Sequence, residues 1–125
     1  MSTACADWLD ARCQEVSALE ARGKAAIAAS DAETYREVMR QKAELLEALF
    51  KNATPCAEGL PPKQREAVLK QLKQFSASAR QALALDSVFY MSALLYRDDH
   101  KEGEPNNLEL LRDRIRSETA ETADA

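Results

Sequence analysis

The residues able to do chemistry in this chain are few and scattered. The single histidine, His100, lies in a charged stretch, without the second histidine or Glu-x-x-His pair of a di-metal helical bundle. No Ser, Cys or Thr nucleophile stands in a recognisable pattern with a histidine base. The three glycines are dispersed, so they form no phosphate-binding loop. We therefore expect a protein that is not an enzyme and that uses no metal or cofactor.

The three cysteines, Cys5, Cys13 and Cys56, form no Cys-x-x-Cys pair and are odd in number. This pattern indicates neither a disulfide framework nor a zinc site. Cys5 and Cys13 fall on or near the apolar face of the first expected helix, so we interpret them as small core residues rather than redox sensors. Reduced thiols, and an N-terminal region without a basic segment followed by an apolar run, predict a cytoplasmic protein with no signal peptide.

Composition and charge exclude several classes of protein. The chain has 125 residues, 46% hydrophobic and 30% charged, with only 3 Gly and 4 Pro, which favours a single helical unit. A net charge of −4 argues against general affinity for nucleic acid. The acidic excess lies in the tail: residues 1–96 hold 12 basic and 12 acidic side chains, and residues 97–125 hold 5 and 9. No apolar stretch approaches the roughly 20 residues that span a bilayer.

The spacing of the apolar residues predicts an all-α fold, an antiparallel bundle of three long helices followed by a short amphipathic helix. Apolar residues recur three and four positions apart, which places them on one helical face. Short connections make consecutive helices antiparallel neighbours. The predicted helices cover residues 3–29, 31–53, 62–97 and 107–117.

Capping and breaking residues set these boundaries. Ser30 and Glu33 have capping-box spacing and predict the start of the second helix. Residues 52–62 contain prolines and a glycine and predict a non-helical connector, after which Pro62 suits a first helical turn. Asn106 or Asn107 is suited to cap the last helix. We expect a bundle domain over residues 1–97, and an acidic linker, short helix and frayed tail over 98–125.

The third predicted helix is longer than the space beside the other two. At the usual rise per residue the third helix measures about 52 Å, whereas the first and second measure about 38 and 33 Å. It should therefore extend past the turn between the first two helices by roughly ten residues. The overshooting segment, residues 88–96, is apolar on most sides, and such a surface needs a cover. The tail helix folding back is one possible cover; a second chain, either a client or another copy, is the other.

Lys42 and Asp86 lie on or close to the apolar stripes. We interpret them as residues at the edge of the core, whose charged ends reach solvent. The alternative is that they fix the register of neighbouring helices as buried polar residues.

The segment from Ala25 to Leu49 resembles the flagellar export chaperones of the FlgN group. Those proteins have a long helix, a break with a small residue and Asp, and a helix carrying Lys-x-x-Leu-Leu-x-x-Leu, here Lys42, Leu45, Leu46 and Leu49. The resemblance covers about residues 8–96. The general layout is also similar, with a proline-containing connector, a long third helix and a mobile amphipathic C-terminal segment. The related FliT-type chaperones are a close second.

The resemblance implies a cytoplasmic type III secretion chaperone that holds the helical termini of hook–filament junction proteins until export. An apolar groove that takes the amphipathic helix of a client is the physical basis of such binding. The alternative is a homo-oligomeric coiled-coil adaptor or structural protein with no export role, for example a homodimer. Nucleic-acid binding and a membrane span are not expected. The predicted partner-binding residues are Leu83, Phe89, Tyr90, Leu94, Leu108, Leu111 and Ile115.

Overall fold

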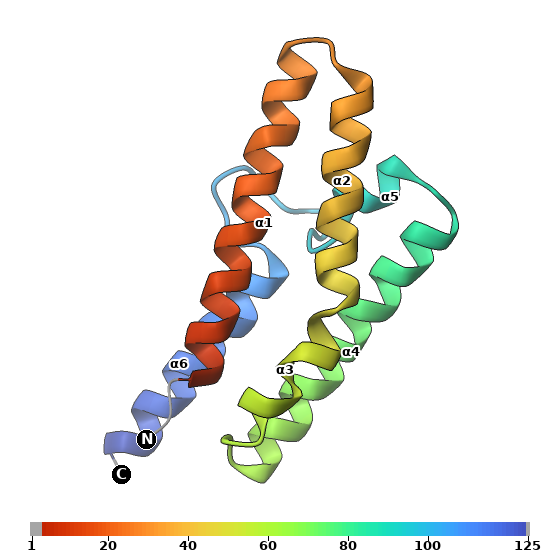
Figure 1. Ribbon diagram of the computed structural model, residues 1–125. Helices are drawn as coiled ribbons and strands as arrows, with labels where there is room; N and C mark the ends of the chain where they lie inside the picture. The colour runs from red at the N-terminus through yellow and green to blue at the C-terminus, as the bar shows by residue number, and fades with distance from the viewer. Residues whose placement is uncertain (1–3, 125) are drawn as a thin grey trace.

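A computed structural model describes the backbone of residues 4–124 and the side chains of residues 4–118. This part of the chain is entirely helical apart from its connections and contains no strand, so the all-α prediction is confirmed (Figure 1). None of these helices has an apolar stretch long enough to cross a membrane. The helices are α1 (Ala4–Ala28), α2 (Ala32–Glu47), α3 (Leu49–Ala57), α4 (Pro62–Ala84), α5 (Val88–Ala93) and α6 (Asn107–Asp124).

Helices α1 and α2 form an antiparallel hairpin (Figure 1). The turn between them uses Ser30 in the left-handed region, at φ 58°. Asp31 then caps α2, because its carboxylate accepts hydrogen bonds from the N–H and the hydroxyl of Thr34, at 3.1 and 2.6 Å. The predicted restart at this position is present, but Ser30 is a turn residue and Asp31 is the cap. Near the turn the two helices approach closely, since a Cβ at Gly23 would lie 2.9 Å from Met39 Cε.

The single helix predicted over residues 31–53 is wrong, because α2 and α3 are separated at Ala48. Ser76 of α4 explains the break. Its hydroxyl donates a hydrogen bond to the carbonyl of Leu46, at 3.0 Å, and accepts one from the N–H of Phe50, at 3.1 Å. In an unbroken helix these two backbone groups would bond each other. A side chain inserted into the backbone ladder in this way bends a helix.

The connector predicted over residues 52–62 is shorter in the structure. Helix α3 continues to Ala57 with Pro55 inside it. The apolar side of this last turn is held in the core by Ala53 and Ala57, both of which are fully buried. Helix α4 starts at Pro62, as predicted from the tolerance of a first turn for proline.

The third helix predicted over residues 62–97 is also wrong, because α4 ends at Ala84. Asp86 adopts a left-handed conformation, at φ 50°, and Ser87 caps α5 by accepting a hydrogen bond from the N–H of Tyr90, at 3.2 Å. Arg36 and Arg40 of α2 hold the Asp86 carboxylate, at 3.2 and 2.9 Å. The chain therefore folds back at this corner, and α5 packs against α2 and α4 instead of overshooting the bundle (Figure 1).

Helix α6 runs antiparallel to α1, beside its N-terminal half (Figure 1). Asn106 caps it: Asn106 Oδ1 accepts from the N–H of Glu109 and Glu109 Oε1 accepts from the N–H of Asn106, both at 2.9 Å. The helix extends past the predicted end at residue 117 to Asp124. Arg112 Nη1 pairs with Asp10 Oδ1 of α1 at 2.9 Å, so a partly buried ion pair fastens the two helices.

The core consists of two clusters of buried side chains. The larger cluster includes Leu9 and Val16 of α1 and joins α1, α2, α3, α4 and α6. The smaller cluster lies between α2, α4 and α5 around Met91, which is fully buried. Leu94 packs against both clusters and thus connects the α5 segment to the rest of the bundle.

Candidate functional site

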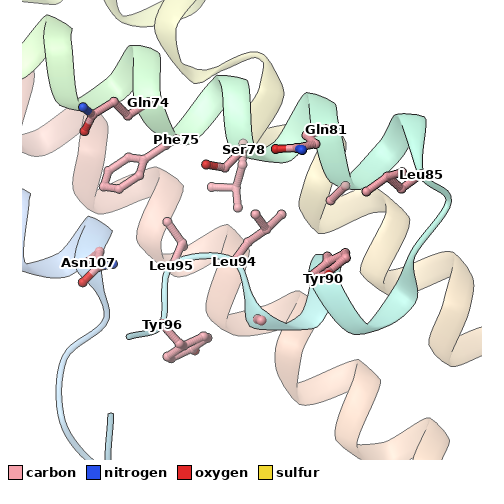
Figure 2. A pocket seen from close by; sticks show the side chains of 13 residues that line it. Gln74, Phe75, Ser78, Gln81, Leu85, Tyr90, Leu94, Leu95, Tyr96 and Asn107 are labelled. Atoms are coloured by element: carbon pink, nitrogen blue, oxygen red, sulfur yellow. The ribbon is translucent and has the colours of Figure 1, made fainter. Parts of the chain in front are cut away.

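A groove of about 610 Å³ lies between α4 and the segment that contains α5 (Figure 2). Its volume falls within the roughly 300–1,000 Å³ that is usual for binding sites. None of its lining residues, all within the described part of the chain, carries a formal charge. These residues are Leu46, Gln74, Phe75, Ser78, Gln81, Ala82, Leu85, Tyr90, Ala93, Leu94, Leu95, Tyr96 and Asn107.

One wall of the groove is a face of α4. Gln74, Ser78, Gln81 and Leu85 follow one another at spacings of four, three and four, which aligns them along a single side of the helix. Figure 2 shows these side chains along α4 together with Phe75, facing the opposite wall. The buried face of α4 is a different set that includes Leu72, Ser76 and Ala79. Helix α4 therefore presents one face to the core and another to the groove.

The opposite wall comes from α5 and the residues that follow it. Tyr90, Leu94 and Leu95 line the groove from this side (Figure 2). Leu95 has a left-handed backbone, at φ 78°, and its carbonyl accepts a hydrogen bond from the N–H of Asn107 at 2.9 Å. This bond joins the end of the groove to the start of α6.

Large apolar side chains remain exposed at the edge of the groove. Phe89, Leu85 and Tyr90 are 75%, 58% and 54% exposed. The rings of Phe89 and Tyr90 meet edge to face, with their centroids 5.6 Å apart. An exposed apolar cluster next to a hollow is typical of an interaction surface on a globular protein.

A buried lysine fixes the position of α5. Lys42 Nζ donates a hydrogen bond to the carbonyl of Ser92 at 3.0 Å and pairs with Glu20 Oε2 at 3.1 Å. The hydroxyl of Tyr96 donates to Glu20 at 2.6 Å, and Lys42 Nζ lies 5.1 Å from the centre of the Tyr96 ring. One polar network thus ties α1, α2 and the α5 segment together behind the groove.

Burial governs the protonation of this network. Removal from water lowers the pKa of Lys42, and the carboxylate of Glu20 partly offsets that effect. Burial, followed by the hydrogen bond to Glu20, raises the pKa of Tyr96. The Tyr96 ring also meets the His100 ring edge to face at 4.7 Å, so His100 is partly covered by protein rather than fully solvated.

The interpretation of Lys42 as an edge residue is wrong. The side chain is completely buried and its ammonium group bonds within the bundle, which is the alternative role of a polar residue that fixes neighbouring helices. Asp86 is exposed, as an edge residue is, but its carboxylate joins the corner between α4 and α5 to Arg36 and Arg40 of α2.

The predicted partner-binding residues are divided between three places. Tyr90 and Leu94 line the groove, and Phe89 lies at its edge. Leu83 is turned toward the smaller core cluster, against which it packs. The three predicted residues of the tail are fully buried in the larger cluster, away from the groove: Leu108, Leu111 and Ile115.

Sequence reasoning missed the contribution of α4 to the groove. Gln74, Ser78, Gln81 and Leu85 form a mostly polar stripe, which is hard to distinguish from an ordinary solvated face. The signal that could have found it is Asp86-Ser87, a pair of turn and cap residues that returns the following aromatic segment onto that stripe.

Comparisons with protein-family models, with curated proteins and with solved structures give no match to this chain.

Proposed function

We propose that this protein is a binding module for helical segments of other proteins, and that the groove between α4 and α5 is its client site. The observation that carries the proposal is an uncharged, largely apolar groove with exposed aromatic residues at its edge, in a chain that is 30% charged. Charged side chains are depleted in the centres of protein interfaces, and aromatic residues are enriched there.

The chemistry of the lining favours holding a helix over transforming a substrate. Phe75, Leu85 and Leu94 offer apolar contacts to the nonpolar side of an amphipathic helix. Gln74 and Gln81 offer neutral amides that can hydrogen-bond to polar residues at the margins of that helix. The lining contains hydroxyl and amide groups but no carboxylate, thiol or imidazole with which to catalyse a reaction.

The resemblance of residues 25–49 to flagellar export chaperones gives the proposal a biological class. In that class the client is the terminal helix of a hook–filament junction protein, which the chaperone holds in the cytoplasm before type III export. The Lys-x-x-Leu-Leu-x-x-Leu run has a physical role consistent with such a scaffold. Lys42 anchors α5, Leu46 lines the groove, and Leu49 lies in the larger core cluster.

A titration of purified protein tests the proposal. The probe is a fluorescent peptide that corresponds to the terminal helix of the hook–filament junction protein from the same organism. We expect saturable binding by the native chain, and at least tenfold weaker binding by Tyr90→Ser, because a central aromatic residue often dominates an interface. Ile27→Ser is the matched control, since Ile27 is similarly exposed, at 58% against 54% for Tyr90, but lies at the end of α1, outside the groove.

Two results would contradict this function. Equal peptide affinities of the native protein and Tyr90→Ser would show that the groove is not the client site. A native protein that is a dimer in light scattering, becomes a monomer on Tyr90→Ser substitution and does not bind the peptide would instead support the homo-oligomeric alternative.

A further inference from the structure

Two cysteines far apart in the sequence meet at the edge of the core, where Cys5 is buried and Cys56 is partly buried. Cys5 lies in the first turn of α1 and Cys56 in the last turn of α3. Their sulfur atoms are 2.9 Å apart although the residues are 51 positions apart in the chain. A disulfide bond has a length of roughly 2.05 Å, so the two atoms need to approach by only about another 0.9 Å to bond.

The two thiols differ in access and in acidity. Cys5 is 1% exposed, whereas Cys56 is only partly buried and can be reached from solvent. The hydrogen bond between the two sulfur atoms lowers the pKa of Cys56. The same hydrogen bond, followed by burial, raises the pKa of Cys5. Cys56 is therefore suited to attack an external oxidant, and Cys5 is placed to react with the resulting adduct.

We propose that Cys5 and Cys56 form a thiol-oxidation site, which a small-molecule disulfide such as oxidised glutathione converts into a disulfide bond between α1 and α3. The Cys56 thiolate attacks one sulfur of oxidised glutathione, forming a mixed disulfide and releasing one glutathione thiolate. The Cys5 sulfur then attacks Cys56 Sγ, and the second glutathione departs as a thiolate that takes up the proton of Cys5. Two protein thiols are oxidised and one glutathione disulfide is reduced to two glutathione molecules.

The bond would cross-link two parts of the larger core cluster. Cys5 belongs to that cluster, and Cys56 packs against it beside Ala53 and Ala57. Because the cross-link closes a loop of 51 positions, it restricts the unfolded chain and should raise the melting temperature by about 5 °C or more. In a reducing cytoplasm the pair remains as thiols, and oxidising conditions change the stability of the bundle without a large rearrangement.

Thiol mapping on the full-length protein tests this site. The reduced protein is incubated at about pH 8 with increasing ratios of oxidised to reduced glutathione, where thiolates are populated. The remaining thiols are alkylated and located by peptide mass spectrometry. We expect the free thiols to fall from three to one, with the remaining thiol on Cys13 and the new disulfide between Cys5 and Cys56.

Single substitutions separate the two roles. Cys5→Ser should stop at a glutathione adduct on Cys56, and Cys13→Ser should still form the internal disulfide. Cys5→Ala gives a second test of the adduct if the serine variant does not fold, as judged by circular dichroism. Retention of all three thiols throughout the series would overturn the proposal, as would a disulfide that joins two chains or includes Cys13.

Discussion

The Nζ atom of Lys42 donates a hydrogen bond to the carbonyl oxygen of Ser92 across 3.0 Å, in a position without solvent access. This contact joins α2 to α5 and thereby holds one wall of the groove at a fixed distance from the bundle. The carbonyl of Ser92 lies in the short helix α5, which has six residues and few hydrogen bonds of its own. A buried polar contact of this kind is strongly destabilising to break, because water does not reach this position to replace the lost hydrogen bond.

Lys42→Met should lower the free energy of unfolding by about 2 kcal/mol or more, since methionine keeps much of the volume but removes both the cation that pairs with Glu20 and the donor to the Ser92 carbonyl. Urea denaturation followed by circular dichroism measures the effect. Lys70→Met, at an exposed position on α4, is the control and should change stability by less than about 0.5 kcal/mol. Equal stabilities of the two variants would show that the Lys42 network does not stabilise the fold.

Two adjacent leucines of α6 differ in burial and therefore in their expected contribution to stability. Leu111 is 2% exposed within the larger core cluster, and Leu110 is 41% exposed. Leu111→Ala should cost about 2–4 kcal/mol through the loss of buried surface and the cavity left behind, whereas Leu110→Ala should cost less than about 1 kcal/mol. Chemical denaturation of both variants checks this difference. Similar losses would mean that α6 is not packed against α1 as described.

Ser76→Ala tests the cause of the break between α2 and α3. The substitution removes the bridge between the Leu46 carbonyl and the Phe50 N–H and should cost about 1–2 kcal/mol. Ser78→Ala, on the exposed groove face of the same helix, should be neutral or slightly stabilising because alanine favours helix. Thermal unfolding of the two variants is the measurement. A Ser76→Ala protein as stable as Ser78→Ala would argue against a structural role for this hydroxyl.

Cys13 should make stability depend on pH in the alkaline range. Burial raises the pKa of its thiol from 9.0 to about 11 in the folded protein. The unfolded chain therefore releases this proton at a lower pH than the folded chain does. The resulting stabilisation is complete below pH 9 and is lost as the pH rises toward 11, by up to about 2–3 kcal/mol.

The Cys13→Ala variant isolates this effect from the other groups that titrate in the same range. The stability difference between the native protein and the variant, obtained from urea denaturation at several pH values, should decrease between pH 9 and 11. A difference that stays constant over this interval would exclude Cys13 as the source.

The sequence allowed the helical class and most core positions to be predicted, because apolar residues at spacings of three and four identify a buried face. It did not allow the positions at which the helices end or continue to be predicted. Pro55 suggested a connector, yet α3 continues through it, since Ala53 and Ala57 are held in the core on either side. The absence of Gly and Pro suggested a continuous third helix, yet Asp86 and Ser87 form a corner stabilised by two arginines from another helix.

The groove was predictable only in part for the same reason. Tyr90 and Leu94 stand out as apolar residues that need a cover. Their partners on α4 are mainly neutral and polar, and only the fold-back at Asp86 brings them opposite one another. Likewise, a lysine on an apolar stripe is ordinarily an edge residue. Lys42 is buried instead because its ammonium group bonds to Glu20 and Ser92, which come from two other helices.

Locating the bound client peptide on the protein surface tests most directly whether the groove between α4 and α5 is the client site. The peptide that corresponds to the terminal helix of a hook–filament junction protein is titrated into isotopically labelled protein, and the amide resonances are followed by two-dimensional NMR. We expect the largest shifts along the α4 wall at Gln74, Ser78 and Gln81, and across the groove at Leu94. Shifts concentrated instead on α1 and α6, with the groove amides unchanged, would contradict the assignment of the client site to this groove.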